Sequence, residues 1–156
     1  MKTTLVAIGK TDDSYIRTGI DKYVNRLRHY ISFDVQVLPD VKNKNLSAEQ
    51  QKLAEAKLLL PFFAPSDIVV LLDEGGQEFT SRAFADFFTK QTLSGRRNLF
   101  FVIGGPYGFA SDVYQRANAK ISLSRMTFSH QMVRLIFLEQ LYRAQTIIKG
   151  EPYHHD

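Results

Sequence analysis

One stretch, residues 99–108, constrains the fold of this chain more than any other. It opens with five apolar residues, rich in aromatic and β-branched types, which predict a strand buried on both faces of a sheet. Three glycines follow within five residues: Gly104, Gly105 and Gly108. Glycine permits positive φ angles and lets a backbone approach a ligand closely. A strand, a glycine loop and a short helix are typical of a nucleotide-like pocket in an α/β protein, although a tight connection would need the same glycines.

Hydrophobic periodicity divides the whole chain into alternating strands and helices. Strands are predicted over residues 3–8, 33–38, 67–72, 99–103 and 121–123. Helices are predicted over residues 12–30, 47–60, 80–93, 111–117 and 130–149, with approximate ends. This order predicts one α/β domain, residues 1–156, with a mostly parallel sheet and helices on both of its faces.

Local signals place the ends of several helices. Ser47 and Gln50 fit a capping box, Ser129 or a neighbour is expected to cap the last helix, and Gly150 fits the position just after it. The last helix is apolar on almost every side, so it must be covered on every side. Because it closes a small domain, we expect a second copy of the chain to cover part of it in a homodimer.

Composition excludes several classes of protein. The 156 residues include no cysteine, so a disulfide framework, a thiolate zinc site and a thiol nucleophile are excluded. No apolar run approaches the ~20 residues of a membrane span, and no signal peptide precedes the first strand, which together predict a cytoplasmic protein with no membrane partner. A net charge of +4 suits a partner that carries phosphates, but many soluble proteins are equally basic.

Several known catalytic and nucleotide-binding motifs are missing. The chain has no phosphate-binding GxxxxGK[ST] loop and no GxSxG elbow for a serine nucleophile. The dinucleotide pattern GxGxxG is not met, and Arg125 lies where that pattern requires an acidic residue. The tail histidines, His154 and His155, lack the usual spacing of metal ligands, so no metal is predicted.

Three predicted loops each follow a buried strand, over residues 73–78, 104–109 and 124–129. Because parallel strands end at the same edge of a sheet, we expect these loops to converge on one pocket. The loops offer backbone N–H and C=O groups and few charged side chains. Such a pocket suits a flat base such as adenine.

Four sequence motifs occur in an order that is typical of a known family. They are IGGPYG at residues 103–108, LSRMTFSHQ at 123–131, LEQLYRA at 138–144 and GEPYH at 150–154, and LVAIG at 5–9 adds an amino-terminal match. On these motifs the whole chain resembles the RlmH family of SPOUT-class methyltransferases. The resemblance implies a carboxyl-terminal trefoil knot, an obligate dimer and S-adenosyl-L-methionine as methyl donor. The implied reaction methylates ring nitrogen 3 of a pseudouridine in 23S ribosomal RNA, with the ribosome as partner.

Matching positions to the family's motifs assigns the methyl-donor site. The resemblance implies that the donor is bound, or its loop shaped, by Leu72, Gly104, Gly105, Gly108, Ser124, Arg125, Met126, Thr127, Phe128 and Ser129. Where the family usually has proline, this chain has Ser129. Serine is a good N-cap, so the following helix is expected to start normally, with a less rigid loop before it.

The reaction requires the target nitrogen to lose a proton. Candidate acceptors are His154 in the tail, His130 at the start of the last helix, and solvent. Tyr153 is a candidate to stack on the target base. The alternative interpretation of this tail is a frayed terminus.

Four further residues are candidates for contact with RNA. Arg143 lies four residues after Glu139, which favours an ion pair within the helix. The alternative is that Tyr142 and Arg143 face the pocket or RNA. Lys22 and Arg26 share a helix face that suits phosphates, and a solvated surface is the alternative.

Two other functions stay open at the level of the sequence. One is a non-catalytic dimer that binds RNA or the ribosome, and the other is an α/β enzyme that uses a different adenine-bearing ligand. The sequence does not select the catalytic base, the number of active sites used per dimer, or the ribosomal assembly state that serves as substrate.

Overall fold

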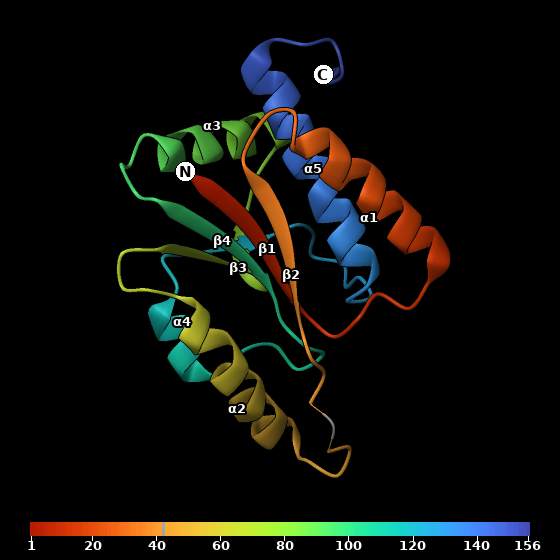
Figure 1. Cartoon of the computed structure of the whole chain (residues 1–156), viewed down its shortest axis with the longest axis vertical. Helices are drawn as coiled ribbons and strands as arrows, with labels where there is room; N and C mark the ends of the chain where they lie inside the picture. The colour runs from red at the N-terminus through yellow and green to blue at the C-terminus, as the bar shows by residue number, and fades with distance from the viewer. Residues whose placement is uncertain (42) are drawn as a thin grey trace.

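A computed structural model describes residues 1–41 and 43–156 of the chain (Figure 1). The order of strands and helices is the predicted one. The elements are β1 (Lys2–Ile8), α1 (Ser14–Leu27), β2 (Phe33–Leu38), α2 (Ala48–Leu59), the 3-10 helix η1 (Leu60–Phe62), β3 (Ile68–Glu78), α3 (Ser81–Thr92), β4 (Asn98–Ile103), α4 (Ser111–Arg116), β5 (Ala119–Ser122) and α5 (Met132–Lys149).

The strands form one sheet in the order β2-β1-β4-β3-β5. Each neighbouring pair is parallel, so the strands all end at the same edge of the sheet. Phe101 and Val102 in β4, the middle strand, are fully buried, which confirms that residues 99–103 are covered on both faces. Each connection between consecutive strands crosses over a face of the sheet and carries an α-helix: α1, α2, α3 and α4 in turn.

Helices cover both faces of the sheet, which confirms the predicted α/β class (Figure 1). Alternate residues of β4 divide between two cores: Leu99, Phe101 and Ile103 pack with α1, α3 and α5, whereas Val102 packs with α2 and α4. The trefoil knot implied by the resemblance stays a prediction.

The last helix, α5, lies between α1 and α3, and Phe137, Leu138 and Leu141 are fully buried there. Much of its apolar surface is therefore covered within one chain, which the sequence did not indicate. Ile148 remains 43% exposed, and Leu135 is half-buried. A homodimer stays a prediction, with less apolar surface to cover than the sequence suggested.

The start of α5 differs from the prediction: the helix begins two residues later, and its N-cap is Gln131, which makes no side-chain capping bond, although Ser129 still contacts the first helical N–H. Residues 130–131 form a turn, and α5 starts at Met132. The Ser129 hydroxyl accepts the N–H of Met132 at 3.1 Å. Ser129 therefore supplies an acceptor to the first helical N–H, as serine commonly does near a helix start.

The prediction of a loop over residues 73–78 is wrong, because these residues extend β3. Leu72 and Gln77 both pair with Ile121, so the residues between them bulge out before pairing with β5 resumes. Gly76 is required at this bulge, since a Cβ there would lie 2.6 Å from the backbone N of Ile121. The Asp-Glu-Gly-Gly sequence is typical of a turn, but its structure depends on a strand more than 40 residues later.

Candidate functional site

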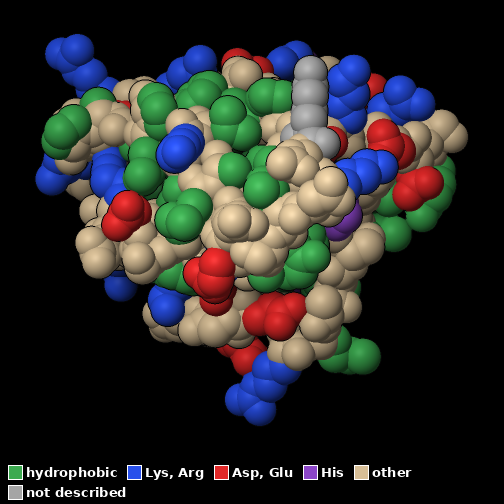
Figure 2. All heavy atoms as spheres, turned by 90° about the horizontal axis from the view of Figure 1, so that it is seen from below, with side chains coloured by type: hydrophobic (Ala, Val, Ile, Leu, Met, Phe, Trp, Pro, Cys, Tyr) green, Lys and Arg blue, Asp and Glu red, His purple; other side chains and the backbone are tan. Residues whose placement is uncertain are grey.

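A cavity of about 590 Å³ lies where β3, β4 and β5 end, at the end of the molecule shown in Figure 2. It is lined by residues 72–74, 103–109, 121–124 and 126–130, with Tyr114 of α4 and Val133 of α5. Hydrophobic side chains (green) and the tan atoms of backbone and other side chains occupy much of the middle of this end, and most Lys and Arg side chains lie nearer its outline (Figure 2). A volume in this range accommodates a drug-sized ligand. The predicted convergence of three segments on one pocket is confirmed.

Almost all residues predicted for the methyl donor line this cavity. They are Leu72, Gly104, Gly105, Gly108, Ser124, Met126, Thr127, Phe128 and Ser129, and His130 lines it too. Arg125 does not: its side chain is 89% exposed, and its Nε donates to Glu78 Oε1 at 2.8 Å. The structure therefore brings the other predicted donor-binding residues together around the cavity, whereas Arg125 lies outside its wall.

The three glycines of the loop after β4 serve different purposes. Gly108 alone among them has a positive φ, +80°. A Cβ at Gly104 would lie 2.9 Å from the ring of Phe109, and one at Gly105 would lie 2.1 Å from Glu55 Oε1. Contacts within the protein, rather than a ligand, thus explain the need for glycine at positions 104 and 105.

Hydrogen bonds within the segment after β5 give the opposite wall a defined shape. The Ser124 hydroxyl accepts the N–H of Met126 at 2.9 Å, and Ser122 Oγ donates to the Ser124 carbonyl at 2.9 Å. Met126 itself is 77% exposed. Short polar side chains therefore shape this loop and leave Met126 available at the cavity mouth.

Asp73 and Tyr114 line the cavity wall and pair with each other, and neither was assigned a role from the sequence. The Tyr114 hydroxyl donates to Asp73 Oδ2 at 2.5 Å, and Asp73 Oδ1 accepts the N–H of Gly75 at 2.8 Å. Burial, together with this hydrogen bond to Asp73, raises the pKa of Tyr114 to about 12, so its phenol stays protonated at neutral pH. The position of Asp73 directly after a buried strand was the available signal, whereas nothing near Tyr114 in sequence marks it.

The predicted tail residues, Tyr153 and His154, lie away from this cavity. His154 Nδ1 is 3.3 Å from Arg143 Nη1, and the Tyr153 hydroxyl donates to Glu139 Oε1 at 3.1 Å. Arg143 also donates to Glu139 at 2.5 Å, which confirms the ion pair predicted within the helix. Arg143 follows the cavity residue Val133 by ten residues. Ten residues span about 15 Å of an α-helix.

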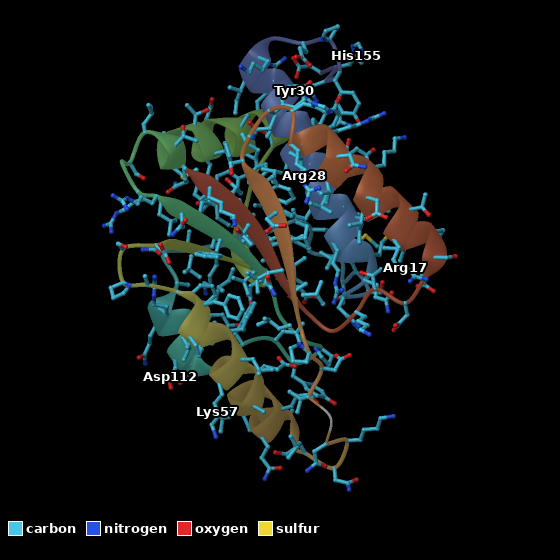
Figure 3. The ribbon with its side chains drawn as sticks, viewed as in Figure 1. Arg17, Arg28, Tyr30, Lys57, Asp112 and His155 are labelled. Carbon is cyan, nitrogen blue, oxygen red and sulfur yellow. The ribbon has the colours of Figure 1, made fainter. Side chains whose placement is uncertain are left out.

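The tail packs into an aromatic group that we call the tyrosine cluster, consisting of Tyr23, Tyr30, Tyr142 and Tyr153. The ring centre of Tyr142 lies 5.8, 5.7 and 4.8 Å from those of Tyr23, Tyr30 and Tyr153, respectively. Tyr30 and His155 lie at this end of the molecule, beside the C-terminus (Figure 3).

Cationic side chains surround the tyrosine cluster. The Arg26 guanidinium lies 5.4 Å from the ring centre of Tyr142, Lys22 Nζ lies 6.0 Å from that of Tyr23, and Arg143 lies 4.8 Å from that of Tyr153. A second cavity, of about 500 Å³, is lined by Arg26, His29, Tyr30, Tyr142, Lys149 and Glu151. The residues predicted to contact RNA therefore lie beside the tail residue Tyr153. They are Lys22, Arg26, Tyr142 and Arg143.

The protonation state of Tyr153 limits what it does chemically. Burial, then hydrogen bonding with Tyr23 and the charge of Glu139, raise the pKa of Tyr153 well above its usual value. The hydrogen bond to Glu139 likewise raises the pKa of Arg143. At neutral pH the phenol is therefore a neutral donor and stacking surface rather than a base, and Arg143 is a cation.

Within residues 1–41 and 43–156, no group of three His, Asp or Glu side chains is placed to hold a metal ion. No helix in those same ranges is long and apolar enough to cross a membrane. The carboxylate of Asp73, which lines the cavity, accepts hydrogen bonds from Tyr114 and Gly75.

Comparison with known proteins relates the whole chain to methyltransferases. A family model described as "Predicted SPOUT methyltransferase" matches residues 1–154. Proteins named "Ribosomal RNA large subunit methyltransferase H" are similar over their full length: that of Parabacteroides distasonis is 55% identical and covers 100% of both chains, and that of Flavobacterium psychrophilum is 56% identical and covers 99% of both.

A solved structure shares the fold. It is described as "The structure of a probable methylase family protein from Haemophilus influenzae Rd KW20" and aligns with a TM-score of 0.50 over 99% of this chain and 70% of that one. The two sequences are 12% identical, so this similarity concerns the fold alone.

Proposed function

We propose that this chain, which belongs to the SPOUT methyltransferase family, transfers a methyl group from S-adenosylmethionine to ribosomal RNA of the large subunit. The observation that carries the proposal is the cavity at the strand ends, lined by nearly every residue expected to bind the donor. The proposed target is ring nitrogen 3 of a pseudouridine in 23S ribosomal RNA. A ribosomal substrate implies a cytoplasmic enzyme. We take residues 1–156 as one methyltransferase domain, since both cores share one sheet.

The cavity fits the methyl donor in size and in chemistry. Leu72, Ile103 and Ile121 supply apolar contacts for an adenine ring, and the segment from Ser124 to Ser129 supplies hydroxyl and backbone groups for its polar part. S-adenosylmethionine, when bound, supplies the methyl group on an electrophilic sulfonium carbon. The residues of the wall contribute by holding the reactants close and correctly oriented.

In one chain the tail lies away from the donor cavity. A tail residue can therefore act at a cavity only if a second copy of the chain supplies it. His154 contacts Arg143 in the tyrosine cluster and does not line the cavity of its own chain. We propose a homodimer in which the tail of each subunit completes the partner's pocket. His154 then accepts the proton of the target nitrogen, with His130 at the cavity wall as the alternative acceptor. Tyr153, neutral at physiological pH, stacks on the target base.

The proposed activity is tested by transfer of labelled methyl groups from S-adenosylmethionine to ribosomes of a strain that lacks this protein. We expect label in the large-subunit RNA, at a single pseudouridine. Calorimetric titration with S-adenosylmethionine, S-adenosylhomocysteine and ATP separates the other candidates. Binding of ATP alone would contradict the methyltransferase function, and donor binding without any transfer would favour a non-catalytic ribosome-binding dimer.

Gly108→Ala should weaken donor binding because the loop after β4 depends on its left-handed backbone. The φ of +80° costs an L-residue about 1–2 kcal/mol, and the loop is expected to rearrange to relieve that strain. Calorimetry with S-adenosylhomocysteine measures the loss. Gly95→Ala is the matched control, since Gly95 has a φ of +74°, open space around it and no place in the cavity wall. Equal donor affinities for the two variants would contradict this role of Gly108.

Arg26→Ala should weaken binding to ribosomes because Arg26 is proposed to contact RNA beside the tyrosine cluster. Affinity falls as salt rises, and loss of one phosphate contact makes the slope of log affinity against log salt shallower by about one. The measurement is the KM for ribosomes at several salt concentrations. Lys57→Ala, on α2 and away from the cluster, is the control of equal charge change (Figure 3). The same slope for both variants would contradict the assignment of Arg26.

A further inference from the structure

The carboxylates of Glu55 and Asp67 are buried and have no role in the proposed function, and that of Glu55 contacts the wall of the donor cavity. Glu55 lies in α2 and is only 4% exposed, next to the buried Ala56. The described residues of α2 do not line the donor cavity. A buried carboxylate is costly unless it is hydrogen-bonded, so its partners indicate why it is there.

The two oxygens of Glu55 have different partners. Oε2 accepts the backbone N–H of Gly105 at 3.3 Å, and Oε1 accepts Nε2 of Gln51, one helical turn earlier, at 3.1 Å. The missing side chain of Gly105 makes the first contact possible, because a Cβ there would lie 2.1 Å from Oε1 and 2.8 Å from Cδ. The carboxylate thus occupies the space that any other residue at position 105 would fill.

The peptide that Glu55 holds is part of the cavity wall. Both Gly104 and Gly105 line the cavity, and the Gly105 carbonyl accepts the N–H of Gly108 at 3.4 Å. In a trans peptide the N–H and the preceding C=O point in opposite directions, so the bond to Glu55 also directs the Gly104 carbonyl away from α2. One hydrogen bond from α2 therefore sets the orientation of this peptide.

We propose that Glu55 is a positioning residue for the donor pocket: from a helix outside the cavity, it orients the peptide between Gly104 and Gly105. The inference rests on the proposed function, since it assigns this wall of the cavity to S-adenosylmethionine. It also explains why position 105 requires glycine, although Gly105 has no positive φ.

The test is a double-mutant cycle read out by the Kd for S-adenosylhomocysteine. Glu55→Ala should raise this Kd about tenfold, the effect expected for one lost hydrogen bond to a charged group. Glu55→Gln keeps an acceptor oxygen and should stay within about twofold of the unmodified chain. Gly105→Ala should weaken binding more strongly, but much less in the Glu55→Ala background, where the added Cβ has space.

Two controls separate positioning from general destabilisation. Gly104→Ala directs its Cβ at Phe109, 2.9 Å away, so its effect should simply add to that of Glu55→Ala. Glu49→Ala, in the same helix but with a 78% exposed side chain, should leave the Kd unchanged. If Glu55→Ala does not fold, the Kd values of Glu55→Met and Glu55→Gln are compared instead. Both variants retain the side-chain volume, and only Glu55→Gln retains an acceptor oxygen.

The outcomes distinguish this inference from the proposed function. Unaltered affinity in Glu55→Ala, with or without a lower melting temperature, would overturn the positioning role, and so would additive effects of Glu55→Ala and Gly105→Ala. An unmodified chain that binds neither S-adenosylmethionine nor S-adenosylhomocysteine would instead overturn the proposed function itself.

Discussion

Removal of residues 151–156 should lower methyl transfer to ribosomes by about a hundredfold or more, the range expected for loss of a general base and its positioning. The truncation leaves each residue of the donor cavity in place, because none of those residues lies in the tail. We therefore expect affinity for S-adenosylhomocysteine to change much less than the rate of transfer. The initial rate with labelled donor and calorimetry on the same preparation provide the two measurements.

Mixed dimers test whether the tail acts in the partner's pocket. One subunit carries the truncation, and the other carries Gly108→Val, which places a β-branched side chain at a φ of +80° and should disrupt the cavity wall. With two affinity tags, the mixed dimer is isolated from both parents. It should recover about half the activity of the intact dimer, since one complete pocket forms per dimer. No recovery would show that each tail serves its own subunit.

A surface variant controls for the general effect of altering the tail. Asp156 pairs with Arg82 through exposed side chains, 67% and 58% accessible, and its Oδ1 lies 3.2 Å from His154 Nε2. Exposed ion pairs contribute little to stability. Arg82→Ala removes this exposed pair and leaves Asp156 beside His154, so it should retain most of the activity, whereas full activity of the truncated chain would contradict a catalytic tail.

Arg134→Met should lower the free energy of unfolding by about 3 kcal/mol, because buried acceptors lose their donor. Arg134 is 3% exposed and donates to the carbonyls of Ile8 and Gly9, each at 2.7 Å, and to Thr11 Oγ1 at 3.1 Å. Burial lowers the pKa of Arg134, while the charges of Asp40 and Asp12 act in the opposite direction. The guanidinium joins α5 to the end of β1 and to the segment that leads into α1.

For a chain of this size, a loss of 3 kcal/mol lowers the melting temperature by roughly 6–12 °C, which thermal unfolding followed by circular dichroism measures. Arg125→Met is the matched control, since its side chain is 89% exposed and its surface pair with Glu78 is expected to contribute within about 1 kcal/mol. Similar melting temperatures for Arg134→Met and the unmodified chain would contradict this account of the buried guanidinium.

The sequence by itself determined those features that depend on residues close together in the chain. The capping box of Ser47 and Gln50, the left-handed Gly150 after α5 and the ion pair of Glu139 with Arg143 are all present as predicted. Each involves residues no more than four positions apart or a single backbone conformation. The apolar run of β4 likewise predicted a central strand, since its composition permits few other environments.

The tertiary structure alone decided features that join distant parts of the chain. Residues 73–78 extend β3 because Gln77 and Glu78 pair with β5 beyond a bulge, and Gly105 is glycine because Glu55, 50 residues earlier, occupies its Cβ space. The bond from Arg134 to Ile8 spans 126 residues, and the separation of His154 from the cavity depends on how the tail packs on α5. Such contacts form only when the chain closes long loops and the layers pack, so neither local spacing nor periodicity encodes them.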